Sequence, residues 1–103
     1  GTYEYSNEIE VLVNPPDKFS LNQNYPNPFN PTTAIEFQLP KESFVTLKVY
    51  NILGFEMATL VTEQKPAGVH KINFNASELP SGMYIYKISA GSFEQTRKMM
   101  LLK

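Results

Sequence analysis

The 103-residue chain contains no cysteine and one histidine, and its net charge at neutral pH is −1. The lack of cysteine excludes disulfides, thiolate metal sites and cysteine nucleophiles. A charge this small gives no reason to expect a nucleic-acid or anionic-membrane partner. No apolar run approaches the roughly 18 residues of a transmembrane helix, and the sequence opens with neither Met nor a signal peptide. We therefore expect a piece of a longer chain, with any export signal upstream.

Residues that could carry chemistry are few and scattered. His70 has the apolar parity of a predicted strand, which favours a packed or edge residue over a metal ligand or catalyst. There is no phosphate-binding glycine loop and no nucleophile elbow. Six carboxylates fall mostly on outward parity, where nothing would raise their pKa for acid catalysis: Glu36, Glu42, Glu56, Glu63, Glu78 and Glu94. We predict no catalytic, cofactor-binding or metal site.

The most unusual stretch is an eight-residue motif rich in asparagine and proline, which we call the Asn/Pro loop: Asn24, Tyr25, Pro26, Asn27, Pro28, Phe29, Asn30 and Pro31. Each proline fixes its own φ and removes a backbone donor, so the motif can form neither a helix nor a central strand. Two large aromatic side chains are of little use in a disordered linker. We predict an ordered, extended loop that Tyr25 and Phe29 anchor on the rest of the domain.

The remainder of the chain alternates apolar and polar residues in short segments that turn residues separate. Inward faces are predicted at Ile35, Phe37 and Leu39, at Val45, Leu47 and Val49, at His70, Ile72 and Phe74, and at Tyr84, Tyr86, Ile88 and Ala90, with further strands over residues 55–62 and 93–102. No helical periodicity of useful length is present. The pattern predicts an all-β domain, an antiparallel β-sandwich of about seven strands, and leaves the strand order open.

Two local features refine this prediction. Gly54 and Gly91 stand at hairpin turns, where we expect positive φ, and Gly68 and Gly82 stand at two further turns. In residues 55–62, Met57 and Leu60 are three apart, so both can face the core only if a bulge lies near residues 58–59.

The first residues are harder to assign. Residues 1–13 alternate like a strand, and residues 14–18 form a proline-rich linker. Residues 1–13 resemble the last strand of a fibronectin type III-like module, so they are either the tail of a preceding module or an extra strand of this domain.

Four tyrosines offer an alternative function. Tyr25, Tyr50, Tyr84 and Tyr86 could line a platform for a carbohydrate, because aromatic rings stack on sugar faces. Tyrosines on the strands of a small sandwich more often pack in the core or at its rim. A carbohydrate-binding accessory module of a secreted hydrolase therefore stays open as an alternative.

From residue 19 to the end, the sequence resembles the type A C-terminal sorting domain of the type IX (Por) secretion system. The resemblance lies in six segments: FSLNQNYPNPFNPTT (19–33), IEFQLP (35–40), VYNILG (49–54), AGVH (67–70), LPSGMY (79–84) and KMMLLK (98–103). VYNILG and SGMY are also similar to the immunoglobulin-like domain of flagellar hook-capping proteins, a structural module. The Asn/Pro loop and the KMMLLK ending favour the sorting domain.

The resemblance implies an immunoglobulin-like sandwich that serves as an address for an exported protein of the Bacteroidetes. An upstream passenger domain would cross the periplasm, and the outer-membrane secretion translocon would recognise the folded domain and deliver the passenger to the cell surface. A sortase-like peptidase would then remove the domain, and residues 14–18 lie where the cut would fall.

The C-terminal strand is the segment that we expect the translocon to read. Met99 and Leu101 share an inward parity, which leaves Met100 and Leu102 on an outward apolar edge with unpaired backbone that invites a partner strand. The alternative is that both faces of this strand are covered within the sandwich and that Lys98 and Lys103 only keep the edge soluble. The predicted recognition residues are Arg97, Lys98, Met100, Leu102 and Lys103. We expect the sandwich to fold without residues 98–103.

Overall fold

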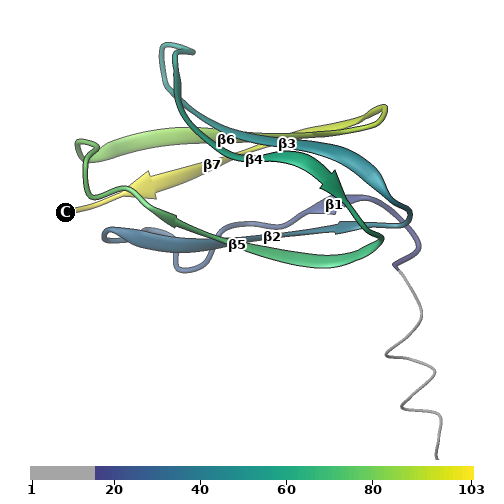
Figure 1. Cartoon of the computed structure of the whole chain (residues 1–103). Coiled ribbons are helices and arrows are strands. Elements are labelled where there is room, and N and C mark those ends of the chain that lie inside the picture. The colour runs from purple at the N-terminus through teal and green to yellow at the C-terminus, as the bar shows by residue number, and fades with distance from the viewer. Residues whose placement is uncertain (1–15) are drawn as a thin grey trace, which may run out of the picture.

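A computed structural model describes residues 16–103, and the strand predicted over residues 1–13 lies outside this range. The described part contains strands and no helix (Figure 1). The strands are β1 (Ser20–Leu21), β2 (Thr32–Leu39), β3 (Ser43–Asn51), β4 (Glu56–Lys65), β5 (Gly68–Asn75), β6 (Gly82–Ala90) and β7 (Phe93–Leu101). The predicted all-β class is confirmed. The two-residue strand β1 was not predicted, because a pair of residues carries no periodicity.

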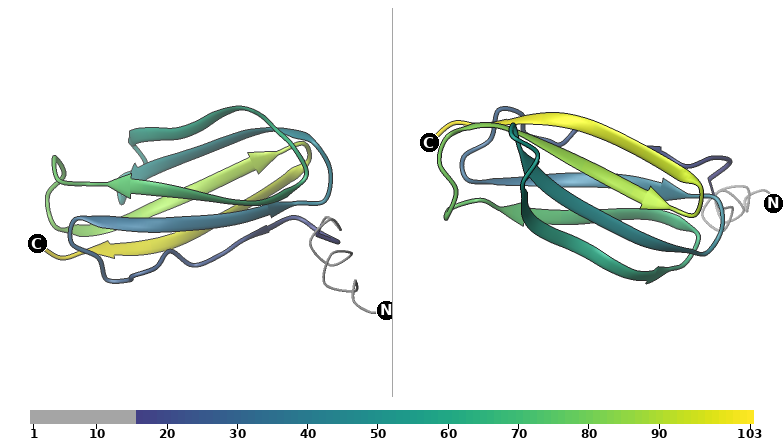
Figure 2. Two further views of the ribbon diagram at one scale, coloured as in Figure 1. Left: turned by 60° about the horizontal axis from the view of Figure 1, so that its bottom comes forward. Right: turned by 90° about the horizontal axis from the view of Figure 1, so that it is seen from above.

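The strands form two antiparallel sheets that face each other, one with the order β1-β2-β5 and the other with the order β4-β3-β6-β7 (Figures 1 and 2). In the constant-type immunoglobulin arrangement the fourth strand belongs to the first sheet, together with the first, second and fifth strands. Here β4 pairs with β3 instead. The assignment of strands to the two sheets is therefore that of an immunoglobulin-like sandwich, except that β4 belongs to the second sheet.

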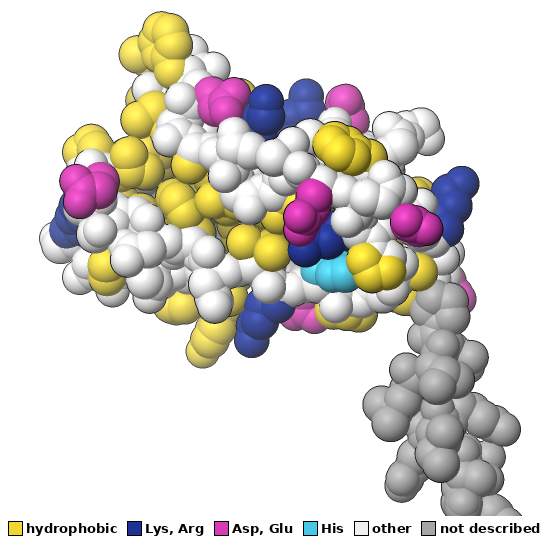
Figure 3. Space-filling model, viewed as in Figure 1, with side chains coloured by type: hydrophobic (Ala, Val, Ile, Leu, Met, Phe, Trp, Pro, Cys, Tyr) yellow, Lys and Arg dark blue, Asp and Glu magenta, His cyan; other side chains and the backbone are white. Residues whose placement is uncertain are grey.

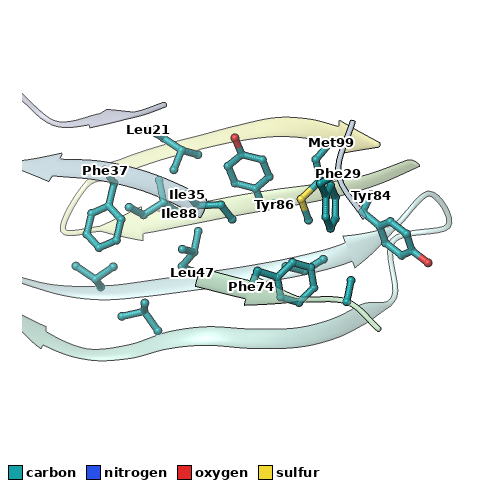
Figure 4. Packing of buried hydrophobic residues seen from close by; sticks show 14 of the residues in the cluster. Leu21, Phe29, Ile35, Phe37, Leu47, Phe74, Tyr84, Tyr86, Ile88 and Met99 are labelled. Carbon is teal, nitrogen blue, oxygen red and sulfur yellow. The ribbon is translucent and has the colours of Figure 1, made fainter. Parts of the chain in front are cut away.

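The core lies between the sheets and follows the predicted alternation (Figure 4). Every second residue of β2, β3 and β6 points inward, where it is removed from water and stabilises the sandwich by the hydrophobic effect. The largest fully buried side chains include those of Tyr86, Phe29, Phe37, Leu21, Ile35 and Leu47.

Strand β4 departs from regular pairing at two places rather than one. Val61 pairs with Leu47 and Thr59 with Lys48, so Leu60 is the extra residue at the first shift. Ala58 then pairs with Val49 and Glu56 with Tyr50, so Met57 is the extra residue at the second shift. The shifts flank the predicted bulge position. Both residues were predicted to face the core. Leu60 does pack against it, but the side chain of Met57 is exposed.

The registers divide the loops between two ends of the sandwich. Ser20 pairs with Gln38 and Val45 with Ala90 near one end, while Asn51 pairs with Tyr84 and Gly82 with Leu101 near the other. We call the first end proximal, because residue 16, the first residue that the structure describes, lies there. The loops at this end are residues 40–42, 66–67 and 91–92. The distal end carries residues 25–31, 52–55, 76–81 and 102–103, including the C-terminus (Figure 2).

Candidate functional site

The Asn/Pro loop is ordered along the sandwich, as predicted, but only one of its two rings anchors it. Phe29 is 2% exposed and packs near Phe74, with 6.3 Å between ring centroids. Tyr25 is 80% exposed, so its predicted role as an anchor is wrong. The reason is register. Tyr25 exchanges two backbone hydrogen bonds of 2.9 Å with Ala34, a residue on the outward face of β2, and paired residues share a face.

The second anchor of the loop is the polar side chain of Asn24, which is almost fully buried. Its Nδ2 donates to the carbonyl oxygen of Pro26 at 3.1 Å and to Oγ1 of Thr33 at 3.0 Å. Its backbone N–H donates to the hydroxyl of Tyr86 at 2.8 Å. Buried polar groups are stable only when they are bonded in this way. Sequence reasoning included Asn24 in the motif and missed its burial, since Asn in a proline-rich stretch is typical of an exposed turn.

The loop also covers the edge of β7. Phe29 and Leu101 form a parallel bridge, in which the Phe29 N–H donates to the Met100 carbonyl at 2.9 Å and the Leu102 N–H donates to the Phe29 carbonyl at 3.0 Å. The Met100 N–H donates to Oδ1 of Asn27 at 3.0 Å. The predicted unpaired backbone at Met100 and Leu102 is therefore wrong. A loop that begins about 70 residues earlier already occupies that edge.

The predicted recognition residues lie together at and near the end of β7, with different surroundings. Arg97 donates from Nε to the Leu21 carbonyl at 2.6 Å, and Lys103 donates from Nζ to the Ser77 carbonyl at 2.6 Å. Lys98 and Leu102 are exposed, and Met100 is partly buried. Their parity is as predicted, since Met99 and Leu101 are buried. Deletion of residues 98–103 would remove both of these side chains from the core, which weighs against the expectation that the sandwich folds without them.

The tyrosines do not form a shared platform. Tyr84 and Tyr86 are buried on β6, and the hydroxyl of Tyr84 donates to the Pro80 carbonyl at 2.7 Å. Tyr25 instead borders an open hollow of about 400 Å³, which is also lined by Pro26, Thr32, Thr33, Ala34 and Asn73. Because Tyr84 and Tyr86 are buried, they are not available for stacking on a sugar beside Tyr25.

His70 is a packed residue on the edge strand β5. Its ring stacks on Phe37 at 5.3 Å between centroids, and Nε2 lies 2.8 Å from the Pro66 carbonyl oxygen. Within residues 16–103, no three His, Asp or Glu side chains are grouped closely enough to hold a metal ion. The described residues also include no helix that is long and apolar enough to cross a membrane.

The family model of the secretion system C-terminal sorting domain matches residues 23–102. The chain belongs to this family. The predicted resemblance is confirmed. The domain is a C-terminal sorting signal for type IX secretion. Its family is typical of the Bacteroidetes and of proteins at the cell surface. It is a sorting family and not a catalytic one. No curated protein matches the chain.

The segments that carry the sorting-domain resemblance gather at one end of the fold. The Asn/Pro loop, the turn after residue 51, the β5–β6 connection and residues 102–103 all lie at the distal end. These segments are far apart in the sequence, and antiparallel pairing brings them together. The AGVH segment, the end of IEFQLP and the first residues of the 19–33 segment lie at the proximal end.

Proposed function

We propose that this sorting domain is a non-catalytic address that takes an upstream passenger domain through the outer-membrane secretion translocon. The passenger travels through the periplasm and is delivered to the cell surface. The family match over residues 23–102 is the observation that carries this proposal. A hook-capping role and a carbohydrate-binding role have no comparable support, and the burial of Tyr84 and Tyr86 weighs against the latter.

The arrangement of the ends supports an address that is read on the folded domain. A passenger would precede residue 16 and so join at the proximal end, which leaves the distal end free. The Asn/Pro loop and the tail, residues 97–103, become neighbours there only when the sandwich has formed. A receptor that touches both would accept folded domains and reject unfolded chains.

Within this surface we assign recognition to Arg97, Lys98, Met100, Leu102 and Lys103, together with the exposed part of the Asn/Pro loop. Leu102 is the exposed apolar member of the tail, and Lys98 and Lys103 are its exposed basic members. Because the edge of β7 is already covered by residues 27–29, recognition uses side chains rather than addition of a partner strand at this point.

The test is a fusion of the full 103-residue chain to an unrelated periplasmic reporter in a host with the type IX secretion system. Leu102→Asn with Lys98→Ser changes only exposed side chains, so the domain should fold while the reporter stays in the periplasm. Deletion of residues 98–103 is unsuitable, because it removes Met99 and Leu101 from the core. Full surface delivery of the double variant would exclude the tail as the signal and direct attention to the Asn/Pro loop.

We also propose that a sortase-like peptidase removes the domain by cutting within residues 14–18. Asp17 and Lys18 are exposed, as a cleaved segment must be. The mass of the reporter recovered from the cell surface locates the cut, and a reporter that keeps the whole sorting domain would refute cleavage.

A further inference from the structure

The turn between β3 and β4 presents three large apolar side chains to solvent. Ile52 is 70% exposed, Leu53 76% and Phe55 64%. We call residues 52–55 the apolar turn. The hairpin that carries it projects from the sandwich, and hydrophobic side chains cover its tip, at the upper left of the view (Figures 1 and 3). Tight hairpin turns are normally polar, so folding of the hairpin does not require these side chains.

The backbone of the apolar turn is bonded internally. The side-chain Oδ1 of Asn51 accepts hydrogen bonds from the Leu53 N–H at 2.9 Å and from the Phe55 N–H at 3.0 Å. The Gly54 N–H donates to the Asn51 carbonyl, and the Asn51 N–H donates to the Phe55 carbonyl, both at 3.0 Å. Backbone groups that are already paired cost little to remove from water. The N–H groups of residues 53–55 therefore lose no hydrogen bond to solvent when the turn enters an apolar site.

The charges beside the apolar turn cancel each other. Lys48 Nζ lies 3.4 Å from Glu56 Oε1, and residues 51–55 carry no charge. A surface helix or loop that binds anionic lipid depends on clustered Lys and Arg, which this hairpin lacks. A neutral apolar projection fits a pocket in a protein better than a charged lipid surface.

The apolar turn is continuous with the proposed recognition surface. On the outward face of the four-stranded sheet, Tyr50 pairs with Ile85 and Met83 pairs with Met100, and all four side chains are at least partly exposed. These residues connect the turn to the tail across the distal half of the sheet. Apolar side chains thus lie on the sheet between the tail and the apolar turn, so one interface can include both Met100 and Phe55.

We propose that the apolar turn inserts into an apolar pocket of the outer-membrane protein that receives this domain. The inference rests on the proposed function and adds the part of the domain that provides apolar contact. Few side chains carry most of the affinity of an interface, and an aromatic ring with aliphatic neighbours on a rigid turn is a suitable group of this kind.

The test compares two variants of the full chain fused to the periplasmic reporter. The first, Ile52→Thr with Leu53→Asn and Phe55→Thr, removes the apolar turn. The matched control, Phe44→Thr with Val69→Thr, removes exposed apolar side chains near the proximal end. The turn variant should reduce surface delivery about tenfold or more, and the control should deliver like the unaltered chain. Equal delivery by both variants would overturn the inference.

Two measurements identify what the turn contacts. A photo-crosslinking residue at position 53 should give one discrete adduct in cells with the secretion system and none in cells without it, whereas position 69 should give none. An adduct that persists without the system contradicts the inference. Purified unaltered chain should not sediment with vesicles of neutral or anionic phospholipid, and sedimentation that the turn variant abolishes would assign the turn to lipid instead.

The outcomes separate this inference from the proposed function. If the unaltered fusion remains in the periplasm, the address function itself is wrong. If the unaltered fusion reaches the surface and the turn variant does so equally, only the apolar-turn inference fails. Equal thermal unfolding midpoints of the purified variants confirm that a loss of delivery is not a loss of folding, and Leu53→Asn alone provides a milder variant for the same assay.

Discussion

The hydroxyl of Tyr86 on β6 bonds the backbone on both sides of Gln23, more than 60 residues earlier in the chain. It accepts a 2.8 Å hydrogen bond from the Asn24 N–H and donates a 2.7 Å hydrogen bond to the Asn22 carbonyl. The ring itself is buried in the core. One side chain thus joins the four-stranded sheet to the segment that begins the Asn/Pro loop, and the loop is positioned by the core.

We expect Tyr86→Phe to destabilise the domain by about 1–3 kcal/mol, because a buried N–H and a carbonyl both lose their partner. The ring keeps its packing, so the cost isolates the hydroxyl. Urea unfolding at neutral pH measures the change. A variant as stable as the unaltered chain would mean that water replaces the hydroxyl at no cost.

Because of the same hydroxyl, the folding stability of the domain should depend on pH in the alkaline range. Burial raises the pKa of Tyr86 above its ordinary value of 10.0, and the hydrogen bond from Asn24 and the charge of Arg97 only partly oppose it. The neutral hydroxyl therefore contributes stability that is fully present below about pH 10 and is lost as pH rises through the folded-state pKa. The stability difference between Tyr86 and Tyr86→Phe should shrink above about pH 10, and a constant difference would contradict this assignment.

Phe29 and Tyr25 provide a matched pair within the Asn/Pro loop. Phe29→Ala removes a buried ring and should cost about 3–5 kcal/mol, a large share of the ~5–15 kcal/mol available to a domain. Tyr25→Ala removes an exposed ring and should change stability by less than about 0.5 kcal/mol. Urea midpoints compare the two, and similar losses for both would mean that Tyr25 packs on the domain in solution.

Leu101 and Leu102 are adjacent in the sequence and opposite in environment. Leu101 is fully buried, so Leu101→Ala should cost about 2–5 kcal/mol. Leu102 is exposed, and Leu102→Ala should stay within about 0.5 kcal/mol of the unaltered chain. Thermal or urea unfolding distinguishes them. A Leu101→Ala domain as stable as the unaltered chain would show that the end of β7 is not part of the cooperative core.

Gly91 lies in the β6–β7 turn with a φ of 61°, a left-handed conformation that a Cβ disfavours. No atom lies within 4 Å of where its Cβ would be, so the cost of Gly91→Val is conformational rather than steric. We expect a loss of about 1–2 kcal/mol for Val and a smaller loss for Asn, which tolerates this region. Equal losses for Val and Asn in urea unfolding would contradict the conformational explanation.

The sequence predicted most of the fold because each strand carries its own evidence. Ile35, Phe37 and Leu39 alternate with polar residues, so which face is buried follows from a period of two. The positive φ at Gly54 and Gly91 followed from their positions at hairpin turns. The family was also recognisable from motif order alone, since the match spans residues 23–102.

The candidate site was less predictable, because its contacts join residues distant in the chain. Tyr25 and Phe29 look alike as aromatic rings among prolines, and only the pairing of Tyr25 with Ala34 turned one ring outward. The exposure of Ile52, Leu53 and Phe55 was likewise missed, although an apolar tetrapeptide at a turn position is a usable signal.

What the sequence determined by itself was therefore local: strand positions, inward faces, turns and the family. What the tertiary structure decided was which distant segments meet, namely that β2 pairs with β5, that Tyr86 bonds the start of the Asn/Pro loop and that Phe29 covers the edge of β7. The physical reason is that periodicity reports which side of a strand avoids water. The partner across a sheet edge depends on the packing of the whole sandwich.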